Sequence, residues 1–362
     1  MSEQVLYRKH RPRGFDEVVG QEHVVTAIRN SLKMERIAHA YLFSGPRGVG
    51  KTTMARLIAK ALNCLDKKNR PCNACAPCKD FNESRAMDLL EIDAASNRGI
   101  DEIRELRDGV RFVPSQGKYK TYIIDEVHML TKEAFNALLK TLEEPPSHAV
   151  FVLATTEIEK VPATIISRTQ HYTFRRPQIP QIAARLQMIA KKEGATLAVD
   201  AGTLIAIAAE GALRDAEGIL GQIMAVQDKN ITAEEVEHIL GLPKREAGKK
   251  LFSAIAKKDA PTALCVVQEL NDAGYDLSSA SKLLMRYFRV ALLLKTDSSL
   301  KSFVGHDFLP DEMECITAHL PSFTVTQLAR AATITLQHMQ QFKKSPIPQL
   351  GLEVTVVEII SV

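Results

Sequence analysis

A glycine-rich run early in the chain has the residue types and spacing of a phosphate-binding loop. Gly45-Pro-Arg-Gly-Val-Gly50-Lys51-Thr52 fits the pattern G-x4-G-K-[ST] at every fixed position. Glycines let backbone N–H groups converge on phosphate oxygens, and the N-terminus of the following helix adds a positive dipole end. Lys51 is expected to reach the β- and γ-phosphates, and the Thr52 hydroxyl to ligate Mg²⁺. The residues expected to hold the nucleotide here are Gly45, Pro46, Arg47, Gly48, Val49, Gly50, Lys51, Thr52 and Thr53.

Two adjacent acids follow a hydrophobic strand later in the chain. Asp125 and Glu126 come directly after Tyr122-Ile-Ile124. Asp125 is expected to hold the Mg²⁺ shell, and Glu126 to orient and polarise an attacking water. Acidic pairs are common at strand ends, but one that follows a phosphate-binding loop indicates an ATPase site. The next strand ends at Ala154-Thr155-Thr156, beside the acidic pair of a parallel sheet.

Four of the six cysteines lie close together as Cys64-x7-Cys72-x2-Cys75-x2-Cys78. Paired C-x2-C spacings direct several sulfurs to one tetrahedral centre, which suits Zn²⁺. An iron–sulfur cluster is the rival, but no C-x3-C-P follows the triplet. Disulfides are not expected in a reducing cytoplasm. Four protein ligands leave no open coordination position, so the zinc role is structural. Cys265 and Cys315, in apolar helical contexts, are interpreted as core residues.

The elements that must position these residues form an α/β domain. Short β-rich runs alternate with amphipathic helical stretches, which is typical of a parallel sheet covered by helices. The helix after Thr131 shows its apolar face in Phe135, Leu138, Leu139 and Leu142, and another helix is expected over Lys51–Leu62. The expected strands are Ala40–Ser44, Leu89–Ile92, Thr121–Ile124, Ala149–Ala154 and His171–Phe174.

Beyond Arg176-Pro177 almost every segment is predicted to be helical. Helices are expected from Gln181 and over 200–209, 214–227, 232–240, 246–257, 260–273, 277–295, 311–319, 324–343 and 351–360, the last weakened by its β-branched residues. We therefore predict three parts: an α/β P-loop domain over 1–176 with a five-stranded parallel sheet, helices on both faces and a zinc module inserted at 64–78; a small helical domain over 177–241; and a second, all-α domain over 242–362.

Composition restricts the class of protein only broadly. The chain has 362 residues, 45% of them apolar, and a net charge of +4. The longest apolar runs, Ala149–Ala154 and Leu204–Ala209, have six residues, whereas a membrane span needs about 20. No secretory signal is visible at the N-terminus, so a soluble cytoplasmic protein without a membrane partner is expected. The mild positive charge neither demands nor excludes nucleic acid.

The order of several motifs resembles one family. They are Arg11-Pro12-x-x-Phe15-x-x-Val18-Val19-Gly20-Gln21, the phosphate-binding loop, Ile124-Asp-Glu-Val-His128, Asn136-Ala-Leu-Leu-Lys-Thr-Leu-Glu-Glu-Pro145, Leu153-Ala-Thr-Thr-Glu157 and Ser167-Arg168. Together they resemble the bacterial DNA polymerase III gamma/tau family, the AAA+ ATPases of the replicative clamp loader. The resemblance covers essentially the whole chain, most densely 5–215, and the 136–145 block is specific to clamp loaders.

This resemblance implies roles for individual residues. Thr155 is similar to sensor 1, which reads the γ-phosphate, and Arg214 to the sensor 2 arginine of the lid. Arg168 resembles an arginine that enters the neighbouring subunit's ATP site. The segment that lines the adenine pocket in the family corresponds to Tyr7, Arg11, Pro12, Val18 and Val19. Thr169 stands where the family usually has cysteine, and His10 where tryptophan is common.

The resemblance also implies a ring-shaped ATPase that belongs to the DNA polymerase III holoenzyme, a DNA-directed DNA polymerase. In such an ATPase, residues 177–241 would form the lid domain and residues 242–362 the collar, the oligomerisation domain. Its cofactors would be ATP, Mg²⁺ and Zn²⁺. Its partners would be delta, delta-prime and further gamma/tau copies, the beta sliding clamp and primer–template DNA. Arg98, in Ser96-Asn97-Arg98-Gly99, and the segment Lys118-Tyr119-Lys120 are weak candidates for DNA contact.

Two other readings remain open from the sequence. One is another AAA+ DNA motor, such as a branch-migration helicase or a recombination-associated ATPase. The other is a non-hydrolysing scaffold subunit of a clamp loader. The complete set Lys51, Thr52, Asp125 and Glu126 argues against a scaffold.

Overall fold

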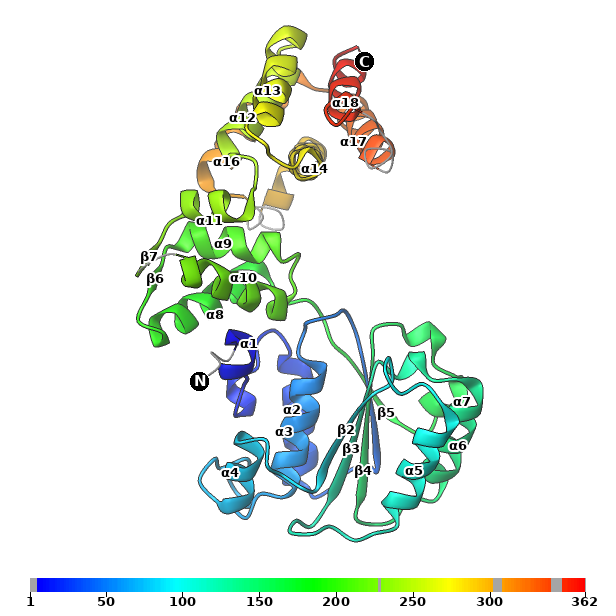
Figure 1. The fold of residues 1–362 in the computed structure, drawn as a ribbon. Coiled ribbons are helices and arrows are strands. Elements are labelled where there is room, and N and C mark those ends of the chain that lie inside the picture. The colour runs from blue at the N-terminus through cyan, green and yellow to red at the C-terminus, as the bar shows by residue number, and fades with distance from the viewer. Residues whose placement is uncertain (1–4, 227–228, 302–307, 340–346, 362) are drawn as a thin grey trace. The chain divides into compact units, whose positions relative to one another are not determined.

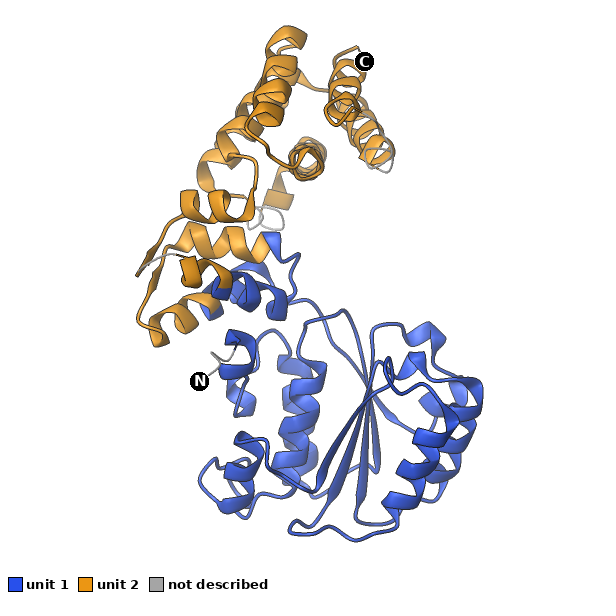
Figure 2. Ribbon diagram, viewed as in Figure 1, with its two compact units in different colours: residues 1–185, 208–221 blue, residues 186–207, 222–362 orange. Residues whose placement is uncertain are grey.

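The computed structural model describes residues 5–226, 229–301, 308–339 and 347–361. The chain separates into two compact units, of which the first comprises residues 1–185 and 208–221 and the second residues 186–207 and 222–362 (Figure 2). The domain boundaries predicted at 176 and 241 stay predictions.

The first unit is built on a five-stranded, wholly parallel sheet with strand order β2-β3-β4-β1-β5. All five predicted strands are confirmed, and no strand end differs from the prediction by more than one residue. The strands β1, β3 and β4 lie in the middle of the sheet and are almost fully buried, which explains their uninterrupted apolar sequences. The strand bounds are β1 Ala40–Ser44, β2 Leu89–Asp93, β3 Lys120–Asp125, β4 Ala149–Thr155 and β5 Gln170–Thr173.

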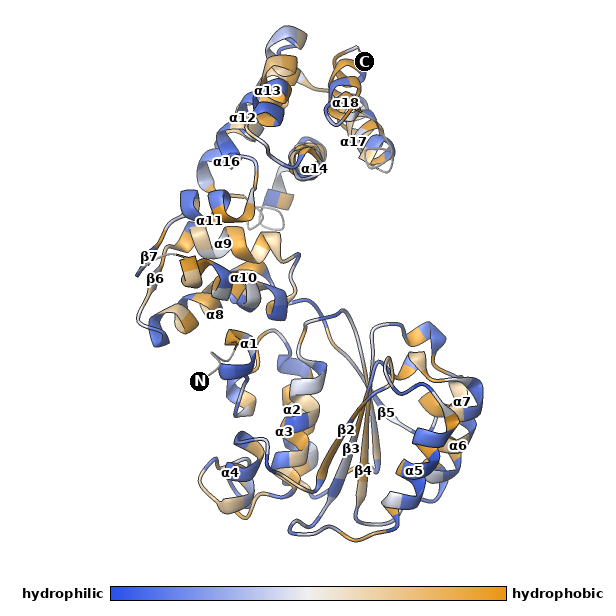
Figure 3. Cartoon of the chain, viewed as in Figure 1, coloured by the Kyte–Doolittle hydropathy of each residue, from blue (hydrophilic) through white to orange (hydrophobic). Residues whose placement is uncertain are grey.

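Helices cover both faces of this sheet, as predicted (Figure 1). On one face, α2 (Glu22–Lys33) and α3 (Lys51–Leu62) pack over β1 and β4 in a core that includes Ile28, Met54 and Phe43. On the other face, α5 (Ile100–Val110), α6 (Lys132–Glu143) and α7 (Ala163–Ile166) form a second core. The central strands are the most continuously hydrophobic part of this unit (Figure 3).

Several short elements carry residues of the candidate sites. They are α1 (Leu6–Lys9), η1 (Phe15–Glu17), α4 (Ala76–Asn82), η2 (Val127–Met129) and η3 (Ile158–Lys160). None of them has the length to show a clear sequence period, so they are visible only in the structure.

The segment from 179 to 240 is mostly helical, as predicted. Its helices are α8 (Ile179–Lys192), α9 (Val199–Ala208), α10 (Leu213–Val226) and α11 (Ala233–Leu240), the last with the predicted capping box of Thr232 and Glu235. A pair of two-residue strands, β6 (Thr196–Leu197) and β7 (Asn230–Ile231), departs from the all-helical prediction. Two residues are too few to show strand alternation.

The C-terminal helices share one core, in which Phe252, Tyr287, Phe288 and Leu352 are buried. The β-branched C-terminal stretch is helical because Leu352, Val356 and Ile359 share one buried face. Predicted helical residues 227 and 340–343 lie outside the described residues. The elements are α12 (Arg245–Ala256), α13 (Ala260–Asp272), α14 (Leu277–Thr296), η4 (Ser298–Leu300), α16 (Pro310–His319), η6 (Leu320–Ser322), α17 (Val325–Met339) and α18 (Leu350–Ile360).

In the part of the chain that the structure describes, no helix combines the length and apolar character needed to cross a membrane.

A buried carboxylate, Asp88, ties the start of β2 to the loop before β3. It accepts backbone N–H bonds from Ser115, Gln116 and Gly117 at 2.6, 2.9 and 2.7 Å. Burial opposes ionisation, but the N–H donors outweigh it and lower the pKa of Asp88. Asp88→Ala is expected to lower the free energy of unfolding by about 2–3 kcal/mol, because three donors lose their acceptor. The exposed Asp108, changed to alanine, is the control and should cost under about 1 kcal/mol.

The sign of the pH dependence follows from the lowered pKa of Asp88. Its stabilisation is complete above the unfolded carboxyl value of about 3.9 and is lost as pH falls through the lower folded value. Urea unfolding at pH 7 and at decreasing pH below 4 measures this. The difference in the free energy of unfolding between the parent and Asp88→Ala should become smaller as the pH falls. A difference that stays constant would contradict the stabilising role of the ionised Asp88.

Candidate functional site

The phosphate-binding loop has the backbone that its glycines permit. Gly48 and Gly50 have φ values of +78° and +99°, in the left-handed region. A Cβ added at Gly45 would lie 2.4 Å from the carbonyl oxygen of Phe174. Gly50 is the N-cap of α3, so the loop leads directly into a helix N-terminus. The loop therefore presents N–H groups and a positive dipole end to one cavity.

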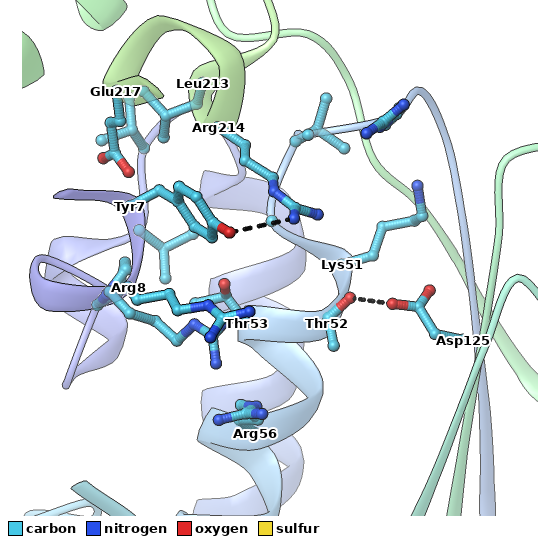
Figure 4. A pocket seen from close by; sticks show the side chains of 18 of the residues that line it. Tyr7, Arg8, Lys51, Thr52, Thr53, Arg56, Asp125, Leu213, Arg214 and Glu217 are labelled. Carbon is cyan, nitrogen blue, oxygen red and sulfur yellow. Dashed lines mark hydrogen bonds between the residues drawn. The ribbon is translucent and has the colours of Figure 1, made fainter. Parts of the chain in front are cut away.

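The three residues expected to act on phosphate and Mg²⁺ meet at this helix start (Figure 4). The Thr52 hydroxyl donates to Asp125 Oδ2 at 2.7 Å. Lys51 Nζ donates to the carbonyl oxygens of Gly45 and Pro46, each at 2.8 Å. Burial lowers the pKa of Lys51, whereas the nearby Glu126 and Asp125 favour its charged form. A hydroxyl and a carboxylate 2.7 Å apart are a suitable donor pair for Mg²⁺.

Glu126 lines the same pocket, and its side chain is held by Thr156 rather than by Thr155. The Thr156 hydroxyl donates to Glu126 Oε2 at 2.9 Å. Thr155 is fully buried, and its hydroxyl lies 3.0 Å from His128 Nδ1. The γ-phosphate role expected for Thr155 stays a prediction. His128 and Thr156 lie in two of the sequence motifs, 124–128 and 153–157, but nothing in the spacing of these motifs indicated the contacts.

Two distant segments close the other side of the pocket. Tyr7 comes from α1 and Arg214 from α10, and the Arg214 guanidinium lies 4.7 Å from the Tyr7 ring centroid (Figure 4). Arg214 Nη2 donates to the Tyr7 hydroxyl at 3.5 Å, which lowers the pKa of Tyr7. The Arg214 backbone N–H also donates to Gly48 at 3.4 Å. Arg214 and the segment expected to line the adenine pocket thus border one cavity with the phosphate-binding loop.

Most of the predicted nucleotide-binding residues line this cavity. They are Tyr7, Arg11, Pro12, Val18, Val19, Arg47, Gly48, Val49, Gly50, Lys51, Thr52, Thr53, Asp125, Glu126 and Arg214. Gly45 and Pro46 contribute the carbonyl groups that bind Lys51. Thr155 and Arg168 are not among the residues that line it.

The cavity also contains residues that sequence reasoning missed. They are Arg8, Arg56, Glu91, Leu213 and Glu217. Arg56 forms an ion pair with Glu91, and burial together with the charge of Arg56 lowers the pKa of Arg11. Arg56 lies one helical turn after Thr52, so helical spacing could have indicated it. Glu91 could not have been found in this way, because it lies in strand β2 and not in α3.

Arg168 lies just after α7, outside the pocket. Its Nη2 donates to Glu143 Oε1 at 2.8 Å, and its Nη1 donates to the Thr164 carbonyl oxygen at 3.0 Å. Its side chain is 37% exposed. The guanidinium is thus partly exposed and is held by Glu143 and by α7. The role expected for it in a neighbouring subunit stays a prediction.

The four clustered cysteines converge as their spacing predicts. The sulfurs of Cys64, Cys72, Cys75 and Cys78 all lie within 4.8 Å of one another. Tetrahedral Zn–S bonds of about 2.3 Å would place sulfurs about 3.8 Å apart, so this set fits zinc. Backbone N–H groups of Ala74 and Cys75 lower the pKa of Cys72 to about 6. Burial raises the pKa of Cys78, so that sulfur needs a cation beside it to ionise.

The segment that carries the cysteine cluster is fixed to α3 by a buried lysine. Lys60 on α3 is 3% exposed and its Nζ donates to the Arg13 carbonyl oxygen at 2.9 Å. It also donates to the side-chain oxygens of Asn73 and Asn82. A cation with three oxygen partners can be buried at low cost. Lys60 thereby connects the cysteine segment to the N-terminal segment that contributes Arg11 and Pro12 to the pocket.

We expect removal of one cysteine ligand to release the metal. Cys75→Ser should lower zinc from about one ion per chain to near zero and reduce the melting temperature, because structural zinc contributes directly to folding. Cys265 is exposed, so the prediction that it is a core residue is wrong. Cys265→Ser is the matched control and should change neither the zinc content nor the melting temperature. Metal analysis and thermal melts measure both. Iron instead of zinc in the parent would contradict the assignment.

The weak candidates for DNA contact differ in their exposure. Arg98 is exposed, and its Nε donates to the Ala95 carbonyl oxygen at 3.0 Å. Lys118 is exposed and Lys120 half-buried. Their proposed role in DNA binding stays untested.

Comparisons with known proteins place the chain in a family. Residues 20–178 match the family model of the DNA polymerase III delta subunit, and residues 231–362 match that of DNA polymerase III subunits gamma and tau, domain III. The chain is 42% identical over 362 residues to DNA polymerase III subunit tau of Bacillus subtilis, covering 99% of this chain but only 63% of that protein.

A second relative matches along its full length. DNA polymerase III subunit gamma of Buchnera aphidicola subsp. Schizaphis graminum is 35% identical over 362 residues, which are 100% of this chain and 99% of the relative. Among solved structures, the Thermotoga maritima RuvB Holliday junction branch migration motor is 20% identical, with a TM-score of 0.50 over 70% of this chain and 80% of that one. This last likeness shows a shared AAA+ fold. The chain therefore belongs to the family of bacterial DNA polymerase III gamma and tau subunits.

Proposed function

We propose that the chain is an ATP-hydrolysing subunit of a replicative clamp loader. The main support for this proposal is that Lys51, the Thr52–Asp125 pair and Glu126 all line one pocket. Family membership supports the loader role, since the Buchnera relative is a DNA polymerase III subunit gamma. A non-hydrolysing scaffold would have no need for all four side chains.

The proposed division of work within the pocket follows residue chemistry. The phosphate-binding loop would bind the phosphates, and Lys51 would exchange its carbonyl partners for β- and γ-phosphate oxygens. Thr52 and Asp125 would hold Mg²⁺, which neutralises phosphate charge when bound. Glu126 would orient the attacking water, with Thr155 near the γ-phosphate as sensor 1. Cys64, Cys72, Cys75 and Cys78 would hold a structural zinc ion away from these steps.

Two arginines would couple hydrolysis to assembly. Arg214, which stacks on Tyr7 in the pocket, would make the lid respond to bound nucleotide. Arg168, exposed after α7, would complete the ATP site of the neighbouring subunit. An arginine supplied in trans contributes about 10³–10⁵ in rate, so an isolated chain should hydrolyse ATP slowly.

The proposed cycle is a population shift driven by the γ-phosphate. ATP binding would order a ring of this chain with further gamma/tau copies, delta and delta-prime subunits through the helical region 242–362. The ordered ring would open the beta clamp and hold primer–template DNA. Hydrolysis stimulated by DNA would release the closed clamp. This role would place the protein in the cytoplasm, at the nucleoid.

A loading assay tests the function. Labelled clamp, partner subunits and this chain are mixed with primed circular DNA, and DNA-bound clamp is separated by gel filtration. We expect clamp on the DNA with ATP and none with ADP. Loading that is equal without this chain would contradict the proposal, and ATP-dependent strand separation or branch migration without a clamp would favour another AAA+ motor.

A further inference from the structure

The side chain of Glu126 is fixed through a single oxygen. Thr156 donates its hydroxyl to Glu126 Oε2 at 2.9 Å, and His128 Nδ1 lies 3.5 Å from the same oxygen. Among the described residues, the side-chain bonds and ion pairs of Glu126 all fall on Oε2. Glu126 nevertheless lines the nucleotide-binding pocket. The other oxygen, Oε1, is thus the one available to a water in that pocket.

His128 binds the residues on both sides of Thr156. Its side chain, on η2, is only 5% exposed. Nδ1 lies 3.0 Å from Thr155 Oγ1, and Nε2 lies 3.2 Å from Glu157 Oε1. The Thr155 hydroxyl oxygen also accepts the Glu157 backbone N–H at 3.0 Å. One imidazole therefore holds the three-residue turn at the end of β4 at both of its ends.

The contacts of His128, Thr155 and Glu157 form a closed ring. The Glu157 carboxylate can only accept, so Nε2 is the donor in its contact with Glu157. Nδ1 and the Thr155 hydroxyl share one hydrogen bond, and the Thr155 oxygen also accepts the Glu157 N–H. Lys160 Nζ, 2.7 Å from Glu157 Oε2, lowers the pKa of Glu157 and keeps it an acceptor. Because each group of the ring has a partner, the turn has one defined conformation.

We propose that His128 and Thr156 are positioning residues for ATP hydrolysis. The imidazole fixes the turn from Thr155 to Glu157, and the turn presents the Thr156 hydroxyl that holds Glu126 toward the attacking water. This inference rests on the proposed ATPase function. Neither His128 nor Thr156 is among the residues that line the pocket, so both act through Glu126 and not on the nucleotide.

Separate measurements of hydrolysis and binding test this inference. Thr156→Val keeps the shape but removes the hydroxyl, Thr156→Ser restores it, and His128→Leu removes both ring nitrogens. We expect Thr156→Val and His128→Leu each to lower the single-turnover rate about tenfold or more, because small misplacements of a catalytic group are costly. The Kd for ATP should stay within about twofold of the parent, and Thr156→Ser should recover most of the rate.

A double variant distinguishes this positioning path from two independent effects. If His128 acts through the turn and Thr156, His128→Leu with Thr156→Val should be about as slow as the slower single variant. Single variants that hydrolyse ATP at the parent rate would overturn the inference. So would a double variant in which the two losses of rate multiply, or a rise in the Kd for ATP that is large enough to explain the loss of rate. If His128→Leu fails to fold, His128→Asn takes its place: it is too short to reach Glu157 and should also slow hydrolysis.

The assay is run with the full chain alone and in the assembled complex with clamp and primed DNA. If clamp and DNA do not change the rate of ATP hydrolysis by the parent, the loader function is contradicted. The rates of the parent and the variants measured with the chain alone would still test the role of His128. A parent chain that hydrolyses no ATP in either setting would overturn both.

Discussion

Replacing Lys51 with alanine is expected to abolish detectable ATP binding. Lys51 is 6% exposed, and its ammonium group lies at the start of α3 among the groups that would hold phosphate. A charge-assisted hydrogen bond contributes about 1.5–3 kcal/mol, and Lys51 would make more than one. We expect the Kd to rise at least about 100-fold, or about 2.7 kcal/mol, in a titration with a fluorescent ATP analogue.

Two controls accompany the Lys51→Ala measurement. Lys33→Ala removes an exposed lysine at the end of α2 and should leave the Kd unchanged. Circular dichroism and a thermal melt show that Lys51→Ala is folded. A folded Lys51→Ala that binds ATP within about threefold of the parent would refute the assignment of the phosphate-binding loop.

Arg168→Ala is expected to separate nucleotide binding from stimulated hydrolysis. Arg168 does not line its own pocket, so the Kd for ATP of the isolated chain should not change. In the assembled complex with clamp and primed DNA, the rate of ATP hydrolysis should fall about 10³-fold or to the unstimulated level. Steady-state phosphate release compared with ATP titration measures the two quantities.

The matched control for Arg168 is Arg85→Ala. Arg85 is also an exposed arginine in ion pairs with neighbouring acids, Asp80 and Glu83, and it lies outside the pocket. It should keep full stimulated turnover. Arg168→Lys keeps the charge without the planar guanidinium and should recover little of the rate. Stimulated turnover that persists in Arg168→Ala would exclude a role for Arg168 in the neighbouring site.

The central sheet and the phosphate-binding loop could be predicted because their sequence signals are local. The strands β1, β3 and β4 are buried on both faces and therefore read as short uninterrupted apolar runs. The helix Lys51–Leu62 has the predicted bounds, because the glycine-rich loop defines its start. The cysteine cluster was equally visible, since ligand spacing along the chain reflects the geometry of the metal.

The contacts that complete the pocket could not be predicted, because they join residues far apart in the chain. Arg56 and Glu91 pair between α3 and β2, and Tyr7 meets Arg214 between the first and a late helix of the same unit. Thr156 and Thr155 are adjacent and chemically alike, so sequence alone could not decide which one contacts Glu126. That choice depends on the alternating direction of side chains at the end of β4.

The most direct test of the clamp-loader proposal is the rate of ATP hydrolysis by this chain mixed with a cognate clamp and partner subunits, with and without primed DNA. We predict strong stimulation that requires both clamp and primed DNA, and that disappears in Lys51→Ala. A rate that is indifferent to the clamp would contradict a clamp-loader function while leaving the ATP-binding site in place.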